Sequence, residues 1–117
     1  MKKIRVVTKA PLEAPDVKEI EHSLANLQKE VGGLLTSVVS EKLEAKNITL
    51  FANDEGLLLG MEQNITDQYY QPIVGPILLA AHNDEGETVS LTDAQVEAAL
   101  SFLKQAPKPL RPGAWLG

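Results

Sequence analysis

The tetrapeptide Asn-Asp-Glu-Gly occurs twice in this 117-residue chain, at residues 53–56 and 83–86, and each copy follows an apolar run. Asparagine, aspartate and glycine favour tight turns, because they tolerate a positive φ that most side chains resist. A second strand-like segment follows each copy, the three leucines at residues 57–59 and the segment at residues 87–91. The repeat therefore predicts two β-hairpins in one sheet, each closed by a glycine with positive φ.

The same repeat has a second interpretation, in which its carboxylates carry chemistry. Asp54, Glu55, Asp84 and Glu85 could share a metal ion or act as general acid and base if the fold brought the two turns together. A general acid also needs a desolvated carboxyl with a raised pKa, whereas carboxyls at turn tips are normally solvated. We therefore favour structural turns and keep a hydrolase that uses these acidic residues as an alternative.

Spacing in the first third of the chain predicts one long helix over residues 16–31. Asp16 as N-cap and Glu19 three residues later form a capping-box pattern, and glycines 32 and 33 supply a stop signal. Apolar residues recur at intervals of three or four, as expected for one buried helical stripe. This stripe consists of Val17, Ile20, Leu24, Leu27 and Val31.

Short segments with the composition or alternation of β-strands predict strands at residues 4–7, 34–43, 48–53, 57–59, 72–81 and 87–91. The run at 72–81 contains Gly75 and two prolines, which predicts a kink or bulge there. Thr92 and Gln95 form a second capping box, which opens a C-terminal helix that Pro107 ends. The fold class is therefore α+β: a single domain over residues 1–106, with a mixed, largely antiparallel sheet of about five to six strands. One helix packs on a face of the sheet, and the C-terminal helix precedes a proline- and glycine-rich tail at 107–117.

Charge and composition exclude several kinds of function. The net charge of −5 opposes long-range attraction to nucleic acid. We interpret the basic group of Lys2, Lys3, Arg5 and Lys9 as the solvated side of an edge strand. With no cysteine and only His22 and His82, each without a partner at helical metal-site spacing, we expect no metal and no cofactor. No apolar run is long enough to span a membrane, so we expect a cytoplasmic protein.

An ordered series of motifs accompanies these elements: residues 31–33, 53–60, Asn64, 73–78, 84–87 and 90–93. In this order and at these separations the chain resembles the family called domain of unknown function 3846, over roughly residues 4–103. The resemblance implies a small accessory protein of a bacterium, phage or mobile element. It implies no activity and no catalytic residues, because none is assigned to the family.

We expect a non-enzymatic module that binds a protein partner, since no constellation of catalytic residues is evident. Tyrosine, tryptophan and arginine anchor interfaces more often than other residues do. The candidate interaction residues are therefore Tyr69 and Tyr70 in the 63–71 loop and Leu110, Arg111 and Trp115 in the tail. A small-ligand binding or sequestering protein is the main alternative. Self-association stays open, direct nucleic-acid binding is disfavoured, and no membrane partner is expected.

Overall fold

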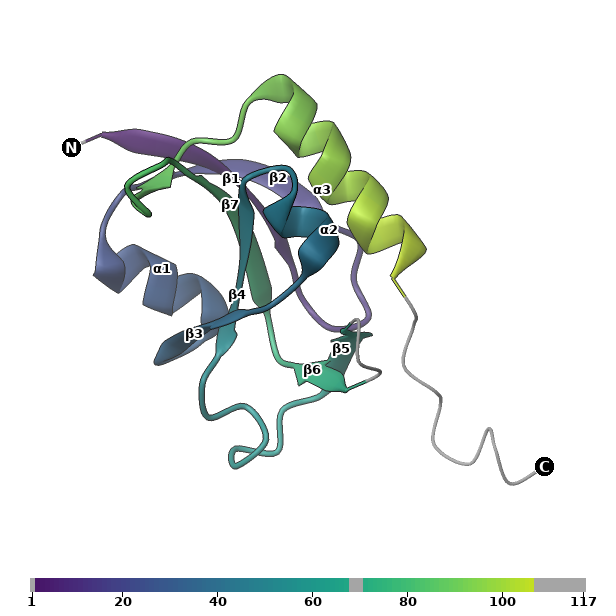
Figure 1. Cartoon of the computed structure of the whole chain (residues 1–117). Helices are drawn as coiled ribbons and strands as arrows, with labels where there is room; N and C mark the ends of the chain where they lie inside the picture. Colours follow the sequence, from purple (N-terminus) through teal and green to yellow (C-terminus); the bar gives the residue numbers. More distant parts are fainter. Residues whose placement is uncertain (1, 68–70, 107–117) are drawn as a thin grey trace.

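The computed structural model describes residues 2–67 and 71–106 of the chain. Within them, five antiparallel strands follow the order β2-β1-β7-β4-β3, β8 adds to β7, and β5 and β6 form a separate two-stranded sheet (Figure 1). The strands are β1 Lys3–Lys9, β2 Asp16–Glu21, β3 Leu35–Val38, β4 Ile48–Asn53, β5 Gln63–Thr66, β6 Pro72–Val74, β7 Ile77–His82 and β8 Thr88–Val89. The helices are α1 Leu24–Val31, α2 Glu41–Glu44 and α3 Asp93–Gln105.

The main sheet is covered on both faces, by α1 on one and by α2 and α3 on the other (Figure 1). This arrangement follows from the alternation of side chains along the strands. In β7, Leu78 and Ala80 pack with α1, whereas Leu79 and Ala81 pack with α2 and α3. The α+β class is confirmed, with its largely antiparallel sheet, its face-packed helix and its C-terminal helix.

The long helix predicted over residues 16–31 is wrong in its first half. Residues 16–21 form β2, which pairs with β1 from Lys3↔Glu21 to Thr8↔Asp16. The helix begins only after Ser23, whose hydroxyl accepts a hydrogen bond from Asn26 N at 3.1 Å. The pairing gives the backbone of residues 16–21 its hydrogen bonds, and tertiary context thereby overrides the helical spacing of the apolar residues. Gly32 ends α1 with φ 80°, as predicted.

The strand predicted over residues 34–43 is correct only for β3. After it, Ser40 becomes the N-cap of α2, and its hydroxyl accepts from Leu43 N at 3.5 Å. Leu43 lies in the core beneath α3. The apolar residue that we assigned to a strand is therefore buried by a single helical turn.

The hairpin predicted at the first Asn-Asp-Glu-Gly copy is also wrong. Residues 57–59 form turns and not a strand. Gly56 does not have a positive φ, and Gly60 takes that role with φ 68°. The chain leaves β4 in a series of hydrogen-bonded turns over residues 54–60, which are described with the candidate site below.

The second copy does form the predicted hairpin. It joins β7 to the short β8, with Gly86 at φ 79°. The predicted kink is confirmed at Gly75, whose φ of 78° separates β6 from β7. The capping box of Thr92 and Gln95 is confirmed at the start of α3.

The prediction that β1 is an edge strand is wrong, because β1 lies between β2 and β7. Two of its basic residues bind within the fold. The Arg5 guanidinium donates to Leu91 O at 2.8 and 3.0 Å and pairs with Asp93 at 2.7 Å, which ties β1 to the start of α3. Lys9 donates to the side chain of Asn64.

Candidate functional site

The most unusual surface feature is a loop of residues 54–62, which we call the leucine loop. Its three consecutive leucines, Leu57, Leu58 and Leu59, are 73%, 86% and 61% exposed. A single exposed leucine is ordinary, whereas contiguous exposed apolar residues typically mark an interaction site. The leucine loop is therefore the first candidate for a functional surface.

The start of the leucine loop is fixed by Asn53, the last residue of β4. Its side-chain oxygen accepts from Glu55 N at 2.8 Å, and its amide nitrogen donates to Val31 O at 3.1 Å. Asp54 N also donates to Leu34 O at 2.7 Å. The two Asn53 bonds join the loop to the end of α1. Because Asn53 is buried, little water competes for these hydrogen bonds.

The segment that follows the loop is fixed by Asn64, which is only 2% exposed. Its amide nitrogen donates to Lys9 O at 2.8 Å and to Gly75 O at 2.9 Å. Its oxygen accepts from the Lys9 ammonium at 2.7 Å. One buried side chain therefore connects β5 to the end of β1 and to the turn before β7.

Close packing at two glycines holds the loop between these asparagines. A Cβ on Gly56 would lie 2.6 Å from Val74 Cγ2, and a Cβ on Gly75 would lie 2.5 Å from Met61 Sδ. Met61 thus packs directly on the backbone of Gly75, and neither glycine leaves room for a side chain. The base of the loop is tightly packed while its leucines face solvent.

All of the charged residues in the leucine loop are acidic. Asp54, Glu55 and Glu62 belong to the loop and are all exposed. Two further exposed leucines, Leu12 at 76% and Leu34 at 54%, lie at the same end of the main sheet. This end of the molecule therefore combines exposed leucines with carboxylates.

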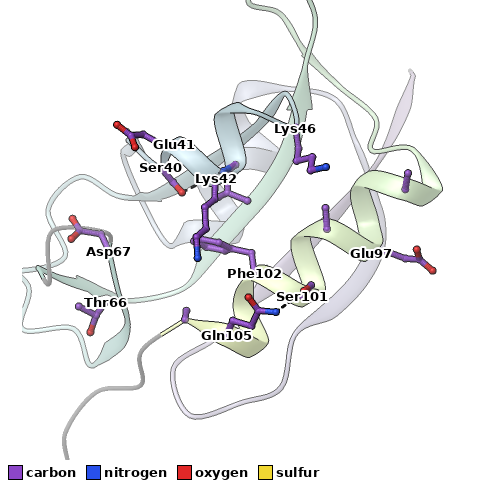
Figure 2. Close-up of a pocket in the computed structure, with 14 residues that line it drawn as sticks. Ser40, Glu41, Lys42, Lys46, Thr66, Asp67, Glu97, Ser101, Phe102 and Gln105 are labelled. Atoms are coloured by element: carbon purple, nitrogen blue, oxygen red, sulfur yellow. Dashed lines mark hydrogen bonds between the residues drawn. The ribbon is translucent and has the colours of Figure 1, made fainter.

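A second candidate is a groove between α2 and α3 that encloses about 1060 Å³ (Figure 2). Phe102 lies at its centre, between the two helices, and Lys42 and Lys46 lie along its α2 side. Thr66 and Asp67 also line the groove, from the segment at the end of β5 (Figure 2). The groove combines apolar walls with polar groups at its rim, which is the common composition of a ligand site.

The two acidic turns do not come together. Strands β4 and β7 are antiparallel, with Ile48 opposite Ala81 and Phe51 opposite Leu78. The turn after β4 and the turn after β7 consequently lie at opposite ends of the sheet. A site shared by the two sets of carboxylates is therefore contradicted by the topology.

In the second turn a side-chain hydrogen bond lowers the pKa of one carboxyl group, that of Glu87. The Asn83 side chain donates to Glu87 at 3.1 Å and lowers the pKa of that carboxyl below its ordinary value. His82 is nearby at the end of β7, where its Nδ1 lies 2.8 Å from the Thr49 hydroxyl and its Nε2 lies 3.4 Å from Glu44. Over residues 2–67 and 71–106, no three histidine, aspartate or glutamate side chains gather as a metal ion requires.

The candidate interaction residues predicted from the sequence, Tyr69, Tyr70, Leu110, Arg111 and Trp115, lie outside the described residues. Asp67 and Gln71, which flank residues 68–70, are described. Asp67 N donates to Gln71 O, and Gln71 N donates to the Asp67 carboxylate, both at 2.9 Å. The leucines at 57–59 were missed because we assigned them to a strand. Their lack of polar–apolar alternation was the signal against that assignment.

Comparison with protein-family models gives a match to the family described as domain of unknown function (DUF3846), over residues 3–105. Neither the comparison with curated proteins nor the comparison with solved structures gives a match. In the described part of the chain, no helix has the length and apolar composition needed to cross a bilayer. The family match spans all of the strands and helices, together with Asn53, Asn64 and the leucine loop. The chain therefore belongs to the family of domain of unknown function 3846.

Proposed function

We propose that this domain is a non-enzymatic binding module that docks on a protein partner through the leucine loop. The observation that carries the proposal is the contrast between the loop's base and its tip. Buried asparagines and tightly packed glycines fix the base, while three adjacent leucines face solvent. We further propose a cytoplasmic accessory role in a bacterium, phage or mobile element, which is what the family resemblance implies.

The size of the exposed apolar surface supports binding. Full burial of one leucine side chain contributes about 1.5–3 kcal/mol, so three leucines could supply much of the free energy of a specific complex. The fixed base matters here, because ordering a loop on binding would offset part of that free energy. Residues 57–59 are thus suited to insert into an apolar cleft.

Charge around the loop defines the partner further. Asp54, Glu55 and Glu62 would repel an anionic membrane, and two copies of the loop facing each other would bring these carboxylates together. A protein with an apolar cleft and a basic rim avoids both penalties. We therefore propose that the partner is a different protein with this surface chemistry.

The test is a comparative pull-down with the full chain and a variant that carries Leu57→Ser, Leu58→Ser and Leu59→Ser. We expect the variant to lose the partner yet unfold at the same temperature, since the three side chains are exposed in the native state. Leu24→Ser is the matched control, because Leu24 is a 63% exposed leucine on α1. If the triple variant retained the same partner, the leucine loop would not be the docking surface.

The groove between α2 and α3 supports a second candidate function, the binding or sequestering of a small molecule. Its volume of about 1060 Å³ and its mixed lining are the favouring observations. Native mass spectrometry of the protein purified from its host would reveal a stoichiometric ligand. Ala98→Trp, which fills the groove, should then abolish the ligand signal, whereas the leucine-loop variant should retain it.

A further inference from the structure

The two edges of the main sheet differ sharply in charge. The edge strand β2 has four charged residues among its six, Asp16, Lys18, Glu19 and Glu21. The opposite edge strand, β3, has none, and residues 31–40 form a continuous stretch without charge. Charged side chains on an edge strand are a common protection against pairing with another chain. Only β2 has that protection.

The backbone of β3 is ready to pair on its outer side. Asp54 N donates to Leu34 O, and the register continues with Leu35 opposite Asn53 and Thr36 opposite Ala52. In an antiparallel ladder, successive residues alternate between inward and outward hydrogen bonding. Thr36 therefore bonds towards β4, whereas Leu35 and Ser37 direct their N–H and C=O groups away from the sheet. Val39 follows the last residue of β3 and would be the next in this alternation if the strand were extended.

We propose that β3 pairs antiparallel with β3 of a second copy of this chain, so that the two main sheets become one continuous sheet. A two-fold axis perpendicular to the sheet places Ser37 opposite Ser37 of the other copy. The same register places Leu35 opposite Val39. Leu35 and Ser37 are outward-bonding, and pairing would extend the strand by one residue to Val39, so that every new backbone pair would have both a donor and an acceptor.

Side chains favour the same register. Leu35 packs against the cluster beneath α1, and Val39, at 68% exposed, is one of the most exposed apolar residues in the described chain. Opposite residues in an antiparallel pair project on the same face, so Val39 of one copy would cover Leu35 of the other. Self-pairing juxtaposes hydroxyl and aliphatic side chains and no like charges. For these reasons a second copy fits this edge.

Sedimentation velocity of the full chain over a range of concentrations tests the proposal. We expect a dimer whose dissociation constant increases by about fivefold in Ser37→Lys, because two ammonium groups would meet at the two-fold axis. Glu19→Lys on the β2 edge is the matched control and should leave the dimer unchanged. A wild-type chain that stays monomeric at every concentration would overturn the proposal, and so would a Ser37→Lys variant that dimerises like the wild type.

A cysteine probe gives an independent result, since the natural sequence contains no cysteine. A hydrogen-bonded antiparallel pair has Cα atoms about 5.5 Å apart, within the range that a disulfide spans. Ser37→Cys should therefore form an intermolecular disulfide rapidly under mild oxidation, whereas Glu19→Cys should not. Equal rates of cross-linking would overturn the proposal even if Ser37→Lys were poorly folded. The triple serine variant of the leucine loop should remain dimeric, which separates this inference from the proposed function.

Discussion

Replacement of Asn64 by alanine should destabilise the domain strongly. Asn64 makes three hydrogen bonds at 2.7–2.9 Å and is 2% exposed. Its loss would leave the carbonyls of Lys9 and Gly75 without this donor and the Lys9 ammonium without this acceptor. Each neutral bond is worth about 1 kcal/mol and the charge-assisted one at least as much, so we expect the free energy of unfolding to fall by about 3 kcal/mol. The melting temperature should fall by roughly 10 °C.

Urea unfolding followed by far-ultraviolet circular dichroism would measure this loss. Asn83→Ala is the matched control, because Asn83 also makes three hydrogen bonds but lies at the exposed second turn. We expect the control to lose less than about 1 kcal/mol, since water replaces the missing bonds. Equal losses in the two variants would refute the reasoning that burial gives Asn64 its importance.

Two further predictions concern the turns. Gly75→Ala should destabilise the domain by about 2 kcal/mol, because alanine disfavours φ 78° and its Cβ would meet Met61. Gly86 has a similar φ of 79°, but a Cβ there would meet open space. Calorimetry should therefore show a smaller loss of stability for Gly86→Ala than for Gly75→Ala. In an NMR titration the Glu87 carboxyl should have a pKa below its ordinary value, and Asn83→Ala should raise it. Since the folded-state pKa is the lower one, the stabilisation by Glu87 is present above its unfolded-state pKa and is lost as the pH falls through the folded-state pKa. Unchanged titration in Asn83→Ala would contradict this cause.

Some elements were predictable because the residues that determine them lie close together in the sequence. The capping box of Thr92 and Gln95 marks the start of α3, because both bonds lie within the first helical turn. The second hairpin was predictable since Gly86 supplies the positive φ that the turn needs. Gly75 likewise marked the break between β6 and β7. In each case residues within a few positions determine the conformation.

The first helix failed because its decisive interactions are not local. Val17 and Ile20 fit a helical stripe, yet residues 16–21 pair with residues 3–8 of β1 and His22 N donates to Lys2 O at 2.8 Å. Lys18, on this strand, also forms an ion pair with Glu30 of α1. The spacing of apolar residues does not predict these contacts, because they depend on where β1 lies in the folded chain.

The leucine loop could not be recognised for a related reason. Three leucines after a turn predict a strand when no partner is known, but here the Asn53 side chain bonds to the loop and to the end of α1 instead. The sequence did draw attention to Asn53, Asn64 and Gly75 as members of one ordered series. Their convergence at one end of the sheet needed the topology.

Photo-cross-linking tests the central claim, that residues 57–59 contact another protein. A photoreactive amino acid at position 58 should give one major adduct with a different protein in the natural host, and the adduct should decrease at high salt if the partner's rim is basic. The same probe at position 24, another exposed leucine, is the control and should not give this adduct. Adducts that are equal at both positions, or that form only with lipid or with the chain itself, would contradict the account.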